Sequence, residues 1–277
     1  MKENERRPVT PRSLVKMKKK GERIAMLTAY DFPTAEVLDE AGIDAILVGD
    51  SLGMVVLGHE TTLPVTMEDV IRHAAAVARA RPKALVIGDL PFLSYTVSVP
   101  DAVANAGRLV KEAGVGAVKL EGGRAMIPVI RAILRASIPV MGHIGLTPQS
   151  ILRFGGYVVQ GRSAIAQERL VEAAKGLEDA GCFAIVLEAI PPELAARVTE
   201  AVGIPTIGIG AGPHCDGQIL VTHDLLGIYD KKLPRFVKRY AELRAEMLRA
   251  FRAYAGDVRK GAYPGPEHVY DGGGSDE

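Results

Sequence analysis

Short apolar runs recur along this chain and predict β-strands. Eight such runs stand between residues 24 and 223. They are IAMLTA (24–29), AILVG (45–49), ALVIG (84–88), AVKL (117–120), PVMGH (139–143), AIVLEA (184–189), PTIGIG (205–210) and QILVTH (218–223). They lack the polar alternation of a half-exposed antiparallel strand, and are therefore typical of parallel strands that are buried on both faces.

The segments between these runs carry helical signals. Residues 66–80 have acids in the first turn and apolar residues at helical spacing, while residues 100–113 and 164–180 each end before a glycine. A short leading helix is predicted over residues 11–20, because Thr10 and Pro11 open it and Gly21 follows it. Helices therefore alternate with strands.

This alternation predicts an α/β fold, a single (β/α)₈ TIM barrel, better than it predicts a doubly wound open sheet. We expect one catalytic domain over residues 1–260, with the leading helix 11–20 included. The polar, Gly- and Pro-rich stretch that starts at Ala255 closes the chain, and residues 261–277 are predicted to be a flexible, partly disordered tail. Two long insertions, residues 50–65 and 144–162, follow strands and are candidate lids.

Composition narrows the functions that are possible. The net charge of +1 offers no concentrated positive field for nucleic acid or an anionic membrane, and the run Lys16 to Lys20 is interpreted as a solvated helix face. No apolar stretch reaches the roughly 20 residues of a membrane span, and the N-terminus lacks a signal-peptide core, so a cytoplasmic protein is expected. Cys182 and Cys215 show neither disulfide nor zinc spacing.

Four acids follow or close predicted strands. Asp50 follows AILVG, Asp89 follows ALVIG, Glu121 follows AVKL and Glu188 closes AIVLE. In a barrel these strand ends face one mouth, so acids far apart in sequence converge. One such acid alone could be a helix N-cap, but four together favour an active site.

Clustered carboxylates repel one another unless a cation or a shared proton compensates them. Oxygen ligands without a cysteine or histidine set favour Mg²⁺ over Zn²⁺. Such a cation binds an oxo acid through its carboxylate and carbonyl oxygens and stabilises an enolate, and a remaining carboxylate can then act as the base.

Lys119 and His143 are further candidates at the same mouth. Lys119 lies two residues before Glu121 and points to the same side of its strand. It could form a structural salt bridge, bind a substrate carboxylate or form a Schiff base. His143 ends the fifth strand and could donate a hydrogen bond to substrate or be a structural histidine. His59, in the first insertion, is expected to stabilise its loop, and the glycines of GIGAGP (208–213) are expected to form tight turns rather than a phosphate site.

Longer motifs carry a resemblance. GDSLGMVVLGHETTLPVT (49–66), GDLPF (88–92), KLEGG (119–123), GHIGLTPQS (142–150), FGGYVVQGR (154–162), LEAIP (187–191) and GIGAGPHCDGQILV (208–221) resemble the ketopantoate hydroxymethyltransferase family, from about Leu14 to Phe251. The family belongs to the phosphoenolpyruvate mutase and isocitrate lyase superfamily of (β/α)₈ barrels.

The resemblance implies a reaction and a site. The family transfers a hydroxymethyl group from 5,10-methylenetetrahydrofolate to 3-methyl-2-oxobutanoate through an Mg²⁺-stabilised enolate, giving 2-dehydropantoate in pantothenate and coenzyme A biosynthesis. By resemblance Asp50 and Asp89 bind Mg²⁺ and Glu121 completes the metal site. Asp50, Ser51, Asp89 and Lys119 contact the oxo acid, and Glu188 is the base. The resemblance also implies a homodecamer, built as a pentamer of dimers.

Three other functions remain open at this stage. One is a metal-free Schiff-base aldolase built on Lys119, and another is a lyase or phosphonomutase of the same superfamily. The third is a binding module whose acids only cap helices. Metal dependence and a requirement for folate separate these alternatives.

Overall fold

A computed structural model describes residues 6–230 and 233–270 of the chain. Contacts between residues divide the chain after Thr222 into two compact units. The first holds all of the strands, and the second begins at His223. The predicted division into a catalytic domain of residues 1–260 and a tail of residues 261–277 stays a prediction.

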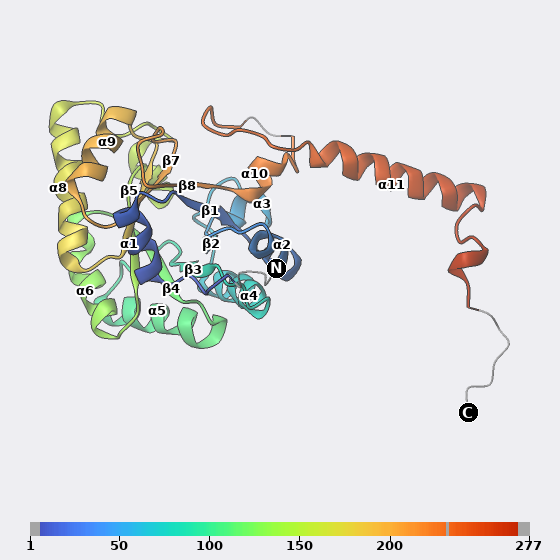
Figure 1. Ribbon diagram of the computed structural model, residues 1–277, viewed down its shortest axis with the longest axis horizontal. Coiled ribbons are helices and arrows are strands. Elements are labelled where there is room, and N and C mark those ends of the chain that lie inside the picture. The colour runs from blue at the N-terminus through green and yellow to red at the C-terminus, as the bar shows by residue number, and fades with distance from the viewer. Residues whose placement is uncertain (1–5, 231–232, 271–277) are drawn as a thin grey trace. The chain divides into compact units, whose positions relative to one another are not determined.

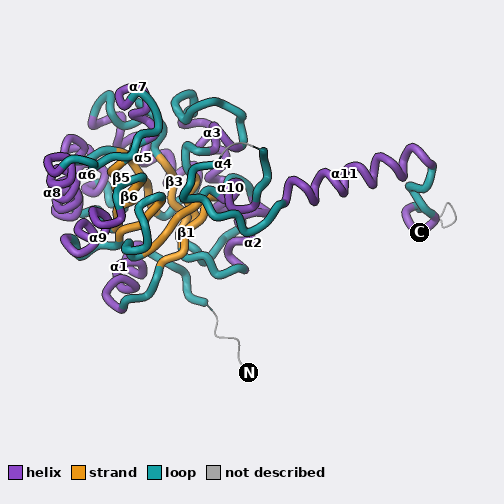
Figure 2. The backbone as a smooth tube through the Cα atoms, turned by 90° about the horizontal axis from the view of Figure 1, so that it is seen from above, coloured by secondary structure: helices purple, strands orange, loops and turns teal. Residues whose placement is uncertain are grey.

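The first unit is a closed barrel of parallel strands in sequence order, β1 to β8. Helices surround the strands (Figures 1 and 2). The strands are β1 (Ile24–Thr28), β2 (Ala45–Val48), β3 (Leu85–Asp89), β4 (Ala117–Glu121), β5 (Val140–Gly145), β6 (Ala184–Glu188), β7 (Thr206–Ile209) and β8 (Gly217–Leu220). The predicted TIM barrel is confirmed, and because β1 pairs with β8 the sheet is not an open one.

Helices and single turns fill the connections between strands. They are α1 (Pro11–Lys20), α2 (Phe32–Glu40), α3 (Leu52–Val55), α4 (Met67–Arg79), α5 (Val99–Ala113), η1 (Arg124–Met126), α6 (Ile127–Arg135), η2 (Pro148–Ser150), α7 (Ile151–Phe154), α8 (Ala164–Ala180), α9 (Pro192–Ala201), α10 (Thr222–Leu226), α11 (Leu243–Lys260) and η3 (Pro266–His268). The long insertions predicted after β2 and β5 thus contain α3, η2 and α7.

Local sequence explains where the predicted helices begin and end. At the start of α4, the Thr66 hydroxyl accepts from the Asp69 backbone N–H, and the Asp69 carboxylate accepts from the Thr66 N–H, a capping box. Glycines in the left-handed conformation end α1, α5 and α8 at Gly21, Gly114 and Gly181, because this conformation costs glycine little.

Strand residues alternate between two apolar layers. Ile46 and Val48 of β2 pack outward against the helices, whereas Ala45 and Leu47 point into the barrel with residues such as Ile87 of β3. Each strand is therefore apolar on both faces, as the absence of polar alternation predicts.

Helix α1 packs at the end of the barrel where the strands begin, here called the amino end. Leu14 is fully buried with the interior residues. The Lys18 ammonium lies 3.0 Å from Asp216 Oδ2 and donates to the Thr199 carbonyl at 2.8 Å. The interpretation of Lys16 to Lys20 as a solvated face is therefore wrong for Lys18, whereas Lys16, Lys19 and Lys20 are exposed.

The second unit contains a helix that the composition did not indicate. Helix α11 runs through Lys260, so the stretch from Ala255, assigned to a polar closing segment, begins as helix. None of its described residues is buried. Its apolar residues Met247, Phe251, Tyr254 and Val258 recur at helical spacing but are exposed. The end of the predicted tail, residues 271–277, lies outside the described residues.

Two further features bear on the predictions. Gly210 and Gly212 have positive φ angles of 63° and 77°, in agreement with tight turns in GIGAGP. Among the described residues, no helix combines the length and apolar character needed to cross a membrane.

Candidate active site

The barrel interior changes from apolar to charged along each strand. On β4 the inward positions are Ala117, Lys119 and Glu121, and on β3 they end at Asp89. Because side chains repeat every second residue, the same face that buries an apolar residue near the amino end presents a charge at the other end. This other end, called the carboxyl end here, holds every acid that the strand positions single out.

Lys119 and Asp89 form a buried ion pair. Strand register sets the two residues side by side. The Lys119 ammonium donates to both oxygens of Asp89, at 2.7 and 2.8 Å, and lies 3.9 Å from Glu121 Oε1. The salt-bridge interpretation of Lys119 is thus observed, and it is compatible with a third N–H that reaches a substrate carboxylate.

Asp50 is brought to the site by the turn after β2 rather than by strand alternation. Its backbone N–H donates to Asp89 Oδ2 at 3.3 Å. Its Oδ2 accepts a hydrogen bond of 2.9 Å from the side-chain amide of Gln149. The three acids Asp50, Asp89 and Glu121 are all buried.

Burial and crowding change the proton affinity of these groups. Burial, followed by the charges of Asp89 and Glu121, raises the pKa of Asp50 well above its usual value. Burial also raises the pKa of Asp89, although Lys119 opposes this. Burial alone would lower the pKa of Lys119, but the surrounding carboxylates outweigh it and raise that pKa. The lysine therefore stays charged, and Asp50 is the acid that burial and its neighbours disfavour most in the charged form.

Glu188 stands apart from this cluster across His143. His143 Nε2 lies 3.2 Å from Glu188 Oε2, and His143 Nδ1 lies 3.5 Å from Glu121 Oε1. Neither contact has the alignment of a full hydrogen bond. Burial and Lys119 lower the pKa of His143, but the two glutamates outweigh them and raise it to about 9. The side chain of Glu188 is 15% exposed, against 3% for Glu121, so Glu188 is the more accessible acid.

The loops around the mouth add polar and aromatic groups. The Ser51 hydroxyl lies 2.8 Å from the Tyr30 hydroxyl. Tyr157 of the second insertion donates to Met54 Sδ of the first at 3.4 Å. Burial and the charges of Glu188, Asp50 and Glu121 raise the pKa of Tyr157, which indicates that its hydroxyl lies near the acids. His59 contributes a backbone N–H to the Gly53 carbonyl at 2.8 Å, a contact within its own loop.

The donors present suit a hard cation of the Mg²⁺ kind. In the described part of the chain, no three His, Cys, Asp or Glu side chains are placed to hold a metal ion together. Mg²⁺ does not require three protein ligands, because it binds through one or two carboxylates together with water and substrate oxygens. Asp50 and Asp89, whose pKa values are raised by burial, would gain most from a nearby positive charge.

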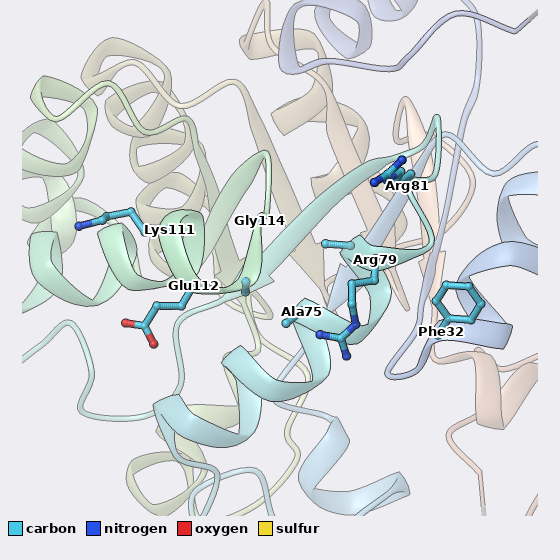
Figure 3. A pocket seen from close by; sticks show the side chains of 9 residues that line it. Phe32, Ala75, Arg79, Arg81, Lys111, Glu112 and Gly114 are labelled. Atoms are coloured by element: carbon cyan, nitrogen blue, oxygen red, sulfur yellow. The ribbon is translucent and has the colours of Figure 1, made fainter.

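A surface hollow elsewhere contains none of these residues. It lies beside helices α4 and α5 and is lined by Phe32, Arg79, Arg81, Lys111 and Glu112, among others (Figure 3). It is outside the barrel interior and has no group from the carboxylate cluster. We therefore assign the chemistry to the barrel mouth.

The structure thus brings together the predicted residues Asp50, Asp89, Lys119, Glu121 and His143, with Glu188 beside His143. Sequence reasoning missed Gln149, Tyr95, Tyr30 and Tyr157. Gln149 lies inside the quoted motif GHIGLTPQS, so that motif was a signal for it. Tyr157 lies inside the quoted motif FGGYVVQGR in the same way, whereas Tyr30 and Tyr95 lie outside the quoted motifs and had no such signal.

Known proteins share both the sequence and the fold. A model of the ketopantoate hydroxymethyltransferase family matches residues 8–266. The 3-methyl-2-oxobutanoate hydroxymethyltransferase of Moorella thermoacetica is 58% identical over 266 residues, covering 96% of this chain and 99% of that protein. The enzyme of the same name from Oleidesulfovibrio alaskensis is 56% identical and covers 92% of this chain and 89% of its own length.

Solved structures support the fold alone. A phosphonopyruvate hydrolase in complex with oxalate and Mg²⁺ has a TM-score of 0.63 at 13% identity, covering 95% of this chain and 92% of that one. A 2,3-dimethylmalate lyase of the phosphoenolpyruvate mutase and isocitrate lyase superfamily has a TM-score of 0.60 at 18% identity, covering 95% and 91%. Both similarities show the barrel fold.

Sequence identity, family match and motif order agree over nearly the whole chain, so the resemblance is confirmed: this enzyme belongs to the ketopantoate hydroxymethyltransferase family.

Proposed function

We propose that this enzyme transfers a hydroxymethyl group from 5,10-methylenetetrahydrofolate to 3-methyl-2-oxobutanoate and releases 2-dehydropantoate. Asp50 and Asp89, with Glu121, would bind Mg²⁺. The observation that carries the proposal is the separation of roles within one mouth: buried acids gather around Lys119, while the accessible Glu188 stands beside His143.

The oxo acid would be held by charge and by hydrogen bonds. Two N–H groups of Lys119 are used by Asp89, and the third can bind the substrate carboxylate. Asp50 and Ser51 would contact the same substrate from the turn after β2. Bound Mg²⁺ would polarise the keto oxygen and make the C3 proton more acidic.

Glu188 would remove that C3 proton and leave an enolate. His143, 3.2 Å from the Glu188 carboxylate, would hold this carboxylate and can also donate a hydrogen bond to substrate. The C3 carbon then forms a bond to the folate methylene carbon while the bond from that carbon to one folate nitrogen breaks, and this nitrogen takes up the proton removed from C3. Water then replaces the second nitrogen: its OH stays on the transferred carbon as the hydroxymethyl group, its remaining proton goes to the nitrogen, and tetrahydrofolate leaves.

The geometry disfavours a Schiff-base aldolase. A lysine must lose its proton before it attacks a carbonyl, and the carboxylates around Lys119 raise its pKa. Its ammonium is also engaged by both oxygens of Asp89. Trapping of Lys119 by borohydride in the presence of substrate would revive that alternative.

Proton exchange at C3 tests the proposal without folate. In D₂O with Mg²⁺, the enzyme is expected to exchange the C3 proton of 3-methyl-2-oxobutanoate, followed by NMR. Glu188→Gln should lower the exchange rate by about 10² to 10⁴, the usual contribution of a general base. Exchange that survives chelation, or that Glu188→Gln leaves unchanged, would contradict the proposal.

The homodecamer and the cytoplasmic location are further parts of the proposal. They are supported by membership of the family, and the solution mass of the purified enzyme tests the first of them.

A further inference from the structure

We propose that Gln149 is a positioning residue that orients the carboxylates of Asp50 and Glu121 for cation binding, and that Tyr95 sets the direction of its amide. The inference rests on the proposed function, since the cation is part of it. It adds two residues that strand positions and motif roles did not assign.

Gln149 contacts two of the three clustered acids at once. Its side-chain Nε2 donates to Asp50 Oδ2 at 2.9 Å, and its backbone N–H donates to Glu121 Oε2 at 3.0 Å. Gln149 itself is 6% exposed and lies in η2, the single turn after β5. One residue on a short turn therefore engages one oxygen of each carboxylate.

The orientation of the Gln149 amide is determined by its partners. Nε2 also donates to the Leu90 carbonyl at 2.9 Å, so both of its N–H groups meet acceptors. The Tyr95 hydroxyl has one proton and two acceptors in reach, Gln149 Oε1 at 2.8 Å and the Glu121 carbonyl at 3.2 Å, and it accepts from the Glu121 backbone N–H at 3.2 Å. A flipped amide would place Oε1 against the two acceptors Asp50 Oδ2 and the Leu90 carbonyl, and it would lose the shorter of the two Tyr95 contacts.

A neutral donor is suited to this task. An amide fixes the direction of a carboxylate but does not cancel its charge, unlike the ammonium of Lys119 on Asp89. The Asp50 carboxylate is therefore oriented by the amide and still gains free energy from a nearby cation. Hydrogen bonds from outside a metal site that orient its ligands typically change metal affinity by 10- to 100-fold.

The test is Mn²⁺ binding to the full chain, measured by electron paramagnetic resonance without substrate. Gln149→Met removes the amide but keeps the size of the side chain and the backbone N–H to Glu121. It is expected to weaken Mn²⁺ binding by about 10-fold or more. Tyr95→Phe, which removes the hydrogen bond to Oε1 but keeps those that Nε2 donates, is expected to produce a smaller loss in the same direction. Turnover of Gln149→Met should return when the Mg²⁺ concentration is raised by a similar factor.

Gln218→Met is the matched control, because its amide donates only to the backbone carbonyl of Gly212, at 2.9 Å, among the contacts described. It should bind Mn²⁺ as the wild type does. If Gln149→Met does not fold, Tyr95→Phe carries the same comparison. Mn²⁺ affinity within twofold of the wild type in a folded variant, or lost turnover that added Mg²⁺ does not restore, would overturn the inference. A wild-type enzyme that binds no divalent cation would instead defeat the proposed function.

Discussion

The two ends of the barrel differ in how their charged side chains are paired: half-buried Lys18 and Asp216 at the amino end, and buried acids at the carboxyl end. At the amino end, Lys18 meets Asp216, and the Thr206 backbone and hydroxyl also donate to that carboxylate. At the carboxyl end, the carboxylates of Asp50, Asp89, Glu121 and Glu188 lie around two cations, Lys119 and His143. Asp216 thus has a cation of its own, whereas the acids at the carboxyl end outnumber their cations.

This difference in charge pairing indicates that the amino end contributes to stability and the carboxyl end to function. A matched, hydrogen-bonded pair at the amino end holds α1 against the strands. An excess of buried carboxylates raises the energy of the folded, metal-free protein, and in the proposed function a bound cation would offset this repulsion. Stabilising substitutions at such sites commonly cost activity.

The largest expected effect, on turnover, comes from replacing an aspartate by asparagine at the carboxyl end. The same replacement at the amino end is its comparison. Asp50→Asn should lower turnover at least a hundredfold, because several kcal/mol of transition-state stabilisation by the cation is lost. It should also raise the free energy of unfolding of the metal-free protein by an amount on the order of 1 kcal/mol, and with it the melting temperature, since a repelled buried charge is removed. Calorimetric unfolding and steady-state kinetics measure both quantities.

Asp216→Asn is the matched change at the amino end. It removes the charge that pairs with Lys18 and should lower the melting temperature, with turnover per folded molecule unchanged. If both substitutions shift stability in the same direction, the contrast between the two ends fails.

A second prediction concerns pH and His143, which faces Glu121, Glu188 and Lys119. The folded pKa is raised from 6.5 to about 9, so its stabilising contribution is complete below pH 6.5 and is lost as the pH rises through 9. The metal-free protein should therefore lose on the order of 3 kcal/mol of unfolding free energy over this range. Urea denaturation at several pH values measures the loss.

The variant His143→Gln should show a clearly smaller loss between pH 6.5 and 9. Lys18→Met should keep the wild-type slope, since it lies at the other end. Equal slopes for the wild type and His143→Gln would show that the pKa of the histidine is not raised by folding.

The smallest expected effect is a loss of stability from a substitution at the amino end. Lys18→Met removes the contacts to Asp216 and Thr199 and should cost about 1–3 kcal/mol, as for hydrogen bonds to charged groups. The melting temperature should fall by about 2–4 °C for each kcal/mol. Mn²⁺ affinity should not change.

Lys20→Met is the matched control on the same helix. Lys20 is 65% exposed and pairs only loosely with Glu22, at 3.4 Å, so its loss should change stability by less than about 0.5 kcal/mol. If the Lys18→Met variant is as stable as Lys20→Met, the contacts of Lys18 do not stabilise the fold, and Lys18 behaves as the solvated residue that the sequence suggested.

Much of the architecture could be predicted because its signals are local. Apolar runs, helix caps and terminal glycines depend on neighbouring residues, so eight strands and the positions of Asp89, Glu121 and Glu188 at strand ends followed from them. Helix α11 was missed because its apolar residues cover no core. The partner of Lys18 was missed because Asp216 is 198 residues further along the chain.

The sequence by itself determined the barrel, the strand-end acids and, through long motifs, the family. Only the tertiary structure decided how those acids differ: which one pairs with Lys119, which one stands beside His143, and that Gln149 orients Asp50 across 99 residues of chain. The physical reason is that strand alternation fixes the face on which a side chain lies, whereas hydrogen-bond partners and burial depend on which loops return to the closed barrel's mouth.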